Sequence, residues 1–375
     1  MRVELIRRPN PSPLFSAVSP LLALAIMILL GAIMFALLTP KGPDQIVTLQ
    51  ERIQFSSTAL YTYFVEPLTE IWSLHELLIK AAPLILIAVG LSVCFLSNNW
   101  NIGAEGQFIV GAIAGSIIPI VFPGFGGPLV LPLMLLMGVL GGMAYAAIPA
   151  ILKARFNTSE ILSSLMLVYV AQLFLDWIVR GPWRNPEGFN FPESRSFNAD
   201  AILPEIVSSS GRAHYGFVFA LIAALVMWFL LNKTLKGFEI RVLGQSPRAG
   251  RFAGFSYTGT VITTFLIAGG LAGLAGIGEV SGAIGQLRPV ISPGYGFTAI
   301  IVAFLGRLNP LGIVAAGLVL ALSYLGGEAV QMLPGGNISN KVASIFQGFL
   351  LFSVLACDTL IHYRIRIALR AGAAG

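Results

Sequence analysis

Charged residues are scarce in this chain: Asp, Glu, Lys and Arg make up only 11% of it, against about 25% in a typical soluble domain. Its two cysteines, Cys94 and Cys357, lie in apolar stretches without a CxxC spacing, which argues against a disulfide framework or metal site. The three histidines are never paired at a ligand spacing. No Gly-Lys dipeptide occurs, which excludes a P-loop and ATP hydrolysis by that route. We therefore predict no catalytic residue, metal or cofactor.

Apolar residues are abundant instead, at 56% of the chain with a mean hydropathy of +0.83. Several apolar runs reach the roughly 20 residues that a membrane-spanning helix needs. The 41 glycines suit close helix packing in lipid. The net charge of +6 is dispersed into loops, which is typical of the positive-inside bias and does not indicate nucleic-acid binding. The sequence predicts an all-α, polytopic protein of the lipid bilayer.

We expect about ten transmembrane helices in a single domain over residues 1–375, with both termini cytoplasmic. The predicted spans lie at about residues 19–38, 76–96, 97–122, 129–152, 159–179, 214–231, 259–280, 296–305, 311–332 and 338–356. The first run is longer than the roughly 7–15 apolar residues of a cleaved signal peptide, so an uncleaved span is favoured. External loops are expected at 41–72, partly as an amphipathic surface helix, and at 181–212, as an ordered, irregular, proline-rich lid.

Several spans are expected to be broken or re-entrant. Pro83 should kink or break the second span, because proline removes a backbone hydrogen bond. The third span begins with a polar, glycine-punctuated stretch from Ser97, which predicts an unwound or re-entrant entry. Residues 281–295 are predicted to form an external turn or half-helix, and the eighth span after them is short.

The longest basic run between two spans is the coupling loop, residues 233–257. It sets five basic residues against the single acid Glu239, namely Lys233, Lys236, Arg241, Arg248 and Arg251. Ser246 as an N-cap and Pro247 at the first helical position predict a short helix to about Phe252, ended by Gly254. This helix either contacts a partner protein or belongs to an ordinary loop whose charges set topology.

Ionisable residues at membrane depth are costly and usually face a partner or a cavity. Glu105 and Glu279 either form helix–helix hydrogen bonds or line a pathway. Lys80, Glu160 and Asp176 lie near predicted span ends, where their side chains can reach the interface. No regular series of acids crosses the membrane, which argues against a proton- or sodium-coupled carrier.

Three motifs carry a resemblance to a known family. They are NWNIGAEGQFIVGAIAG at Asn99–Gly115, FNTSEILSSLMLVYVA at Phe156–Ala171 and VLGQSPRAGRFAGFS at Val242–Ser256. Together they resemble permease subunits of bacterial ABC importers for simple sugars, nucleosides and branched-chain amino acids. The chain is most similar to the longer of two permeases in nucleoside importers served by basic-membrane-protein lipoproteins, from about Leu14 to Leu360.

The resemblance implies a multi-pass permease in the bacterial plasma (inner) membrane. Its implied partners are a two-domain ATP-binding subunit that binds the ATP, a second, non-identical permease and a periplasmic or lipoprotein substrate-binding protein. The residues implied to couple to the ATPase are Gly244, Ser246, Pro247, Arg248, Arg251 and Gly254. Gly250 departs from the alanine more common in relatives, which leaves the length of the coupling helix open.

The expected function is ATP-driven import of a small polar solute. The residues expected to line its pathway come from broken or glycine-rich helices and are Asn98, Asn101, Glu105, Gln107 and Glu279. Nucleosides are the first expectation for the solute on the resemblance alone, and simple sugars and amino acids remain open. An ion-gradient-driven secondary carrier and a purely structural membrane protein are the competing classes.

Overall fold

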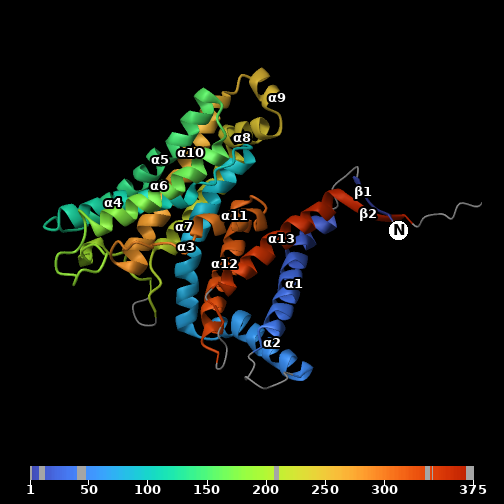
Figure 1. Cartoon of the computed structure of the whole chain (residues 1–375). Coiled ribbons are helices and arrows are strands. Elements are labelled where there is room, and N and C mark those ends of the chain that lie inside the picture. Colours follow the sequence, from blue (N-terminus) through green and yellow to red (C-terminus); the bar gives the residue numbers. More distant parts are fainter. Residues whose placement is uncertain are drawn as a thin grey trace, which may run out of the picture. The chain divides into compact units, whose positions relative to one another are not determined.

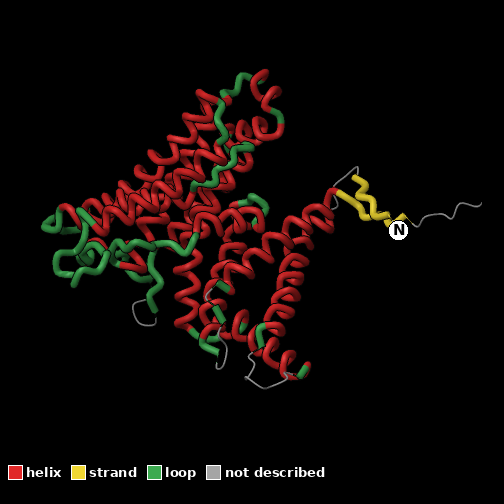
Figure 2. The backbone as a smooth tube through the Cα atoms, in the orientation of Figure 1, coloured by secondary structure: helices red, strands yellow, loops and turns green. Residues whose placement is uncertain are grey.

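The computed structural model describes residues 2–7, 13–39, 48–206, 211–333, 338–339 and 341–368. Parts of both external loops and of the 333–337 turn lie outside the described residues. The described part is almost entirely helical, as predicted (Figures 1 and 2). It divides into two compact units: residues 68–322 form one, and residues 1–67 with 323–375 form the other.

Seven described helices are long and apolar enough to cross a membrane. Three shorter apolar stretches, Leu21–Leu37, Tyr295–Leu305 and Val342–Cys357, lie where the remaining three spans were predicted. The protein is therefore a polytopic helical membrane protein.

The larger unit contains most of the helices. They are α3 (Ile71–Leu96), α4 (Ala104–Val121), α5 (Val130–Phe156), α6 (Glu160–Arg180), α7 (Gly216–Lys233), α8 (Leu235–Gln245), α9 (Pro247–Phe252), α10 (Tyr257–Glu279), α11 (Tyr295–Leu305) and most of α12 (Pro310–Gln331). Short turns of other helix types lie at Glu66–Leu68, Ala199–Ala201 and Val280–Ile284.

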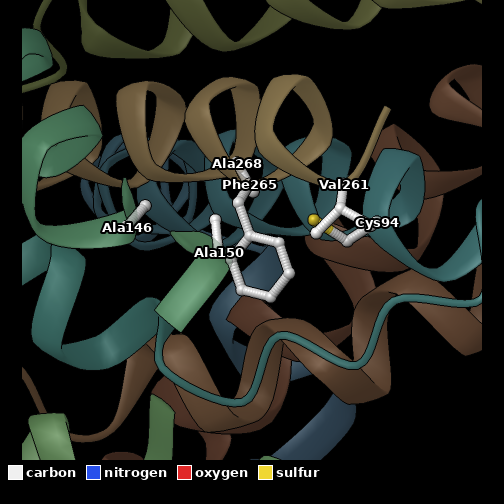
Figure 3. Packing of buried hydrophobic residues seen from close by; sticks show 6 residues of the cluster. All are labelled: Cys94, Ala146, Ala150, Val261, Phe265 and Ala268. Atoms are coloured by element: carbon white, nitrogen blue, oxygen red, sulfur yellow. The ribbon is translucent and has the colours of Figure 1, made fainter. Parts of the chain in front are cut away.

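Helix α10 is the centre of this unit and packs against α3, α4 and α5. Its glycines allow backbones to touch: a methyl group on Gly273 would overlap the carbonyl oxygen of Gly138, and one on Gly142 would overlap that of Gly269. Small residues permit this approach in lipid, where packing contributes much of the association energy. Nearer its start, Phe265 of α10 lies among Cys94 of α3 and Ala150 of α5 (Figure 3).

The smaller unit contains α1 (Pro13–Leu37), α2 (Leu49–Phe64), the end of α12 and α13 (Val342–His362). The Tyr63 ring stacks on Phe346 at 4.2 Å between centroids, and its hydroxyl lies 2.5 Å from Ser323 Oγ. Helix α2 is the predicted helix of the 41–72 loop and begins with a capping box between Thr48 and Glu51. Those hydrogen bonds from Thr48 hold the pKa of Glu51 below its ordinary value.

Two strands that the sequence did not predict join the chain ends. β1 (Arg2–Arg7) pairs antiparallel with β2 (Tyr363–Ala368), with Arg2 opposite Ala368. An even number of spans with both termini on one side is consistent with this pairing.

Three local predictions can be compared directly with the structure. Of the kink or break predicted at Pro83, the break is wrong, because α3 continues as one helix through a stretch that is buried from Ala81 to Phe95. The predicted non-helical entry to the third span is confirmed, since helix α4 starts only at Ala104. The lid is irregular as predicted, with only one short 3-10 turn among its described residues.

Candidate functional site

The N-terminus of α11 lies in the interior of the larger unit and is where two predicted pathway acids meet. Glu105, at the start of α4, is buried and accepts a hydrogen bond from the Gly296 backbone N–H at 2.6 Å. The two backbones are so close that a methyl group on Gly296 would overlap Glu105. A carboxylate at a helix N-terminus is favoured by the unpaired N–H groups and the helix dipole.

Glu279 reaches the same helix end from α10. It is only 8% exposed, and its carboxylate is hydrogen bonded to Tyr295 and attracted by Lys80 of α3. Its Oε2 atom has no hydrogen-bond partner among the described residues. The two acids therefore approach one short, membrane-embedded helix from two neighbouring helices, a geometry typical of sites built on discontinuous helices.

Of the other predicted pathway residues, Asn98 and Asn101 lie in the unwound segment, residues 97–103, and Gln107 lies in the first turn of α4. Asn101 and Gln107 are buried and pair reciprocally through their side-chain amides, at 3.0 and 3.1 Å. Asn101 Oδ1 also accepts the Gly103 N–H at 3.0 Å. Asn98 is exposed, has a left-handed φ of 56° and accepts from Trp100 Nε1. The amides of Asn101 and Gln107 thus hold the segment's shape. Asn98 lies instead beside Trp100, which stacks on Phe304 at the far end of α11 from the two acids.

A buried ion pair that the sequence reasoning missed anchors the same segment. Lys153, in the last turn of α5, donates to Glu160 Oε1 at 2.6 Å and to Asn99 Oδ1 at 2.7 Å. Glu160 also accepts the Trp100 backbone N–H at 3.3 Å, and Asn99 donates to Thr264 of α10. The two charged side chains are only 9% and 14% exposed, so Glu160 does not reach for the interface as expected.

The coupling loop contains two helices rather than one. The predicted helix is α9, Pro247–Phe252, and Gly254 follows it with a left-handed φ of 83°, as expected for a helix end. Ser246 occupies the N-cap position without a side-chain hydrogen bond. Helix α8 before it was not predicted; Thr234 caps it, and Ile240 and Leu243 face inward.

Helix α8 is tied to the membrane helices at two points. Gly244 packs so closely against the end of α3 that a methyl group there would overlap the Leu96 carbonyl oxygen. Glu239 accepts hydrogen bonds from Thr260 at 2.6 Å and from Lys236 at 2.9 Å. Burial raises the pKa of Glu239, but these hydrogen bonds and the Lys236 charge outweigh it and hold the pKa below its ordinary value.

Helix α9, by contrast, presents side chains outward. Arg248 and Arg251 are exposed, and the guanidinium of Arg251 lies 5.4 Å from the centre of the Tyr257 ring. Phe252 is 95% exposed. An aromatic side chain flanked by two arginines on a protruding helix is typical of a protein-binding surface. The sequence reasoning did not select Phe252, although an aromatic residue at the end of a basic helix was a visible signal.

Comparison with known proteins decides the family. A family described as "Branched-chain amino acid transport system / permease component" matches residues 73–355. The chain belongs to this permease family. The expectation drawn from the three motifs is therefore confirmed, and the protein is a membrane-spanning permease of an ABC transporter.

Curated relatives cover most of this permease. The glucose ABC transporter permease protein TsgB13 of Haloferax volcanii is 35% identical, over 81% of this chain and 82% of its own length. The guanosine ABC transporter permease protein NupP of Bacillus subtilis is 34% identical, over 76% and 81%. The nucleoside ABC transporter permease protein NupB of Lactococcus lactis is 28% identical, over 89% of each chain.

Proposed function

We propose that this permease forms the solute pathway of an ATP-driven importer in the bacterial plasma membrane, with nucleosides as the solute and simple sugars as the alternative. Relatives described as glucose and nucleoside permeases support a small hydroxylated solute. The observation that carries the proposal is the pair of buried acids, Glu105 and Glu279, at the start of α11. Buried ionisable groups inside a membrane protein normally serve a pathway.

The energy would come from a partner. The permease is a transport component without its own ATPase site or cofactor, and a two-domain ATP-binding subunit binds the ATP. Helix α9 docks on that subunit through Arg248, Arg251 and Phe252, all of them exposed. Gly244, Pro247 and Gly254 fix the position and ends of α9, and Ser246 directly precedes it. A substrate-binding protein delivers the solute on the opposite face.

A second, non-identical permease completes the pathway. Two Bacillus subtilis guanosine permeases, NupP and NupQ, are both similar to this chain, at 34% and 30% identity. Two related permeases for one solute support a paired arrangement here. In this arrangement, closure of the ATP-binding subunits moves α9, and the two permeases rock to open the pathway alternately to each side.

Uptake of labelled solute into proteoliposomes tests the function. We expect ATP-dependent uptake of a nucleoside only when the permease is reconstituted with its partner permease, ATP-binding subunit and binding protein. Uptake of glucose but not nucleoside would select the sugar alternative. Uptake by this chain alone under an ion gradient would instead make it a secondary carrier.

Pull-down of the ATP-binding subunit tests the docking surface. The Arg248→Ala/Arg251→Ala double variant should insert normally into the membrane and capture much less of the subunit. Phe252→Ala should weaken capture as well, since buried aromatic anchors at interfaces commonly contribute 2 kcal/mol or more, which is roughly a 30-fold change in Kd. Arg180→Ala, which removes an exposed arginine at the far end of α6, is the matched control. Wild-type capture by the double variant would refute the docking assignment.

A further inference from the structure

Two buried polar atoms at the outer end of α10 lack a hydrogen-bond partner among the described residues. They are Oε2 of Glu279 and Nε2 of His214, the residue just before helix α7 begins. His214 is 3% exposed and Glu279 is 8% exposed. A buried polar group without a partner costs about 1–3 kcal/mol, so two of them at one end of the same helix need an explanation.

His214 presents a hydrogen-bond donor. Its Nδ1 accepts the Gly216 backbone N–H at 3.1 Å, so the proton of the neutral ring lies on Nε2. Burial lowers the pKa of His214 to about 4, although the charge of Glu76 opposes the shift, and the ring stays neutral near pH 7. Nε2–H is therefore an unused donor.

The donor faces the same turn that carries Glu279. Residues Val280–Ile284 continue α10 as a π-helical turn, a geometry frequent at functional sites. A methyl group on Gly282 would overlap the His214 ring at Nε2, so the ring edge lies directly against this turn. Gly282 is three residues after Glu279, so the histidine ring and the Glu279 carboxylate lie at the same end of α10.

The irregular lid holds this turn in place. The Leu203 N–H donates to the Ser281 carbonyl at 2.9 Å, and the Phe197 N–H donates to the Gly285 carbonyl at 2.8 Å. Ile206 donates to the carbonyl of Ala213, which directly precedes His214. The lid thereby fixes the distance between the histidine and the turn, so that the donor and the acceptor are preorganised.

Charged residues of both signs surround the pair. Glu76 forms an ion pair with Arg212 at 2.7 Å, and Lys80 attracts Glu279. His75 accepts the Ala213 N–H through Nδ1, and Glu205 lies opposite His214 in an antiparallel bridge. A molecule with hydroxyl groups, which both donate and accept, fits one free donor and one free acceptor.

We infer that His214 and Glu279 contact the solute, with His214 Nε2–H donating to a hydroxyl oxygen and Glu279 Oε2 accepting a hydroxyl proton. This inference rests on the proposed importer function and narrows the solute to a hydroxylated compound.

Substitutions that move one hydrogen-bonding atom at a time test the contact in the complete reconstituted transporter. His214→Asn keeps an acceptor near the Nδ1 position but removes the distal donor, whereas His214→Gln keeps a donor near the Nε2 position. Glu279→Gln keeps the size of the side chain and removes its charge. Asp176→Asn is the matched control, because this acid forms an exposed pair with Arg180.

The measurement is KM for a labelled ribonucleoside and for its 2′-deoxy, 3′-deoxy and 5′-deoxy counterparts, with capture of the ATP-binding subunit measured in parallel. We expect His214→Asn and Glu279→Gln to raise KM about tenfold, the loss of roughly one hydrogen bond. Each should also lose discrimination against one deoxy counterpart, while capture stays normal. His214→Gln should keep most of the affinity, and the Asp176→Asn control should behave as wild type.

The possible outcomes distinguish failure of the proposed His214–Glu279 contact from failure of the proposed importer function. If the wild type transports nucleoside but His214→Asn and Glu279→Gln keep its KM and its discrimination, the contact is refuted and the importer function stands. If His214→Asn does not assemble, Glu279→Gln decides in the same way. If the wild-type complex takes up a branched-chain amino acid and no hydroxylated solute, both the inference and the proposed solute are wrong.

Discussion

The buried polar side chains at the two ends of α10 differ in how fully they are hydrogen bonded. Near Tyr257, the polar side chains around the helix are paired: Thr260 bonds Glu239, Thr264 bonds Asn99, and Lys153 bonds both Asn99 and Glu160. At the other end, Glu279 Oε2 and, beside it, His214 Nε2 have no partner among the described residues. One helix therefore connects a region of paired polar side chains to a region with unpaired polar atoms.

The difference separates two tasks. A fully hydrogen-bonded network in a low-dielectric interior is rigid, because loss of any one partner costs free energy. A rigid network of this kind is suited to transmitting the motion of α8 and α9 to the membrane helices. Unpaired donors and acceptors are suited to binding, because a solute can form hydrogen bonds with them without breaking a hydrogen bond within the protein. Close glycine contacts in the middle of α10, such as Gly273 against Gly138, join the two ends mechanically.

The largest effect is expected where the paired end is broken. Lys153→Met leaves the Glu160 carboxylate without its counter-ion in a site where the two side chains are only 9% and 14% exposed. Loss of one partner of a buried pair costs about 3–5 kcal/mol. The midpoint of thermal unfolding in detergent should fall clearly. Asp176→Asn, in an exposed pair, should change the midpoint little. Equal shifts in the two variants would contradict the claim that the low exposure of the Lys153–Glu160 pair makes it costly to break.

The second effect concerns pH at the unpaired end. Burial lowers the pKa of His214 from 6.5 to about 4 in the folded chain. Between these values the unfolded chain binds a proton that the folded chain does not, so stability falls as the pH falls. The loss should reach on the order of 2–3 kcal/mol near pH 4. His214→Gln should remove this part of the pH dependence of the unfolding midpoint, and an unchanged pH profile would show that His214 titrates normally.

The third effect concerns the glycines between the two ends. Gly273→Ala introduces a methyl group that overlaps the Gly138 carbonyl and should cost about 1–3 kcal/mol of stability. Gly278→Ala, five residues along the same helix, meets no atom within 4 Å and should be neutral or stabilise by up to about 1 kcal/mol. Unfolding midpoints of the two variants compare them directly, and a fall for both would mean that the contact at Gly273 is not specific.

The smallest effect concerns two serines that precede helices. Ser256 caps α10 through its hydroxyl, which accepts the Gly259 N–H at 3.1 Å, whereas Ser246 makes no side-chain cap bond to α9. Ser256→Ala should cost about 1 kcal/mol. Ser246→Ala should leave both the unfolding midpoint and capture of the ATP-binding subunit unchanged. A larger effect at Ser246 would reveal a contact made only in the complex.

The sequence predicted features that depend on local chemistry. Apolar length located the spans, and the Ser246-Pro247 pair with Gly254 located α9 at its observed bounds, because capping and proline geometry act within a few residues. Helix α8 was missed because its charged residues suggested a loop. The inward-facing Ile240 and Leu243, three residues apart, together with the Thr234 cap, were the signals for it.

Features that depend on distant partners could not be predicted. Glu160 was expected to reach for the interface, and only the fold places Lys153 beside it. Pro83 was expected to break its helix, but the packing that buries both of its flanks keeps α3 continuous. In the sequence, His214 is only a histidine at a span boundary. That its Nε2 is buried and unpaired depends on the packing of the π-helical turn against the ring, which the sequence does not show.

The most direct test of the two-ended account measures two quantities on two variants of the reconstituted transporter. For Arg248→Ala/Arg251→Ala and for Glu279→Gln, both the capture of the ATP-binding subunit and the discrimination between a ribonucleoside and its deoxy counterparts would be determined. We predict that the first variant loses capture and keeps the discrimination of its residual uptake, while the second keeps capture and loses discrimination. If both variants lose both properties together, the two ends of α10 are not separate sites, and the account is wrong.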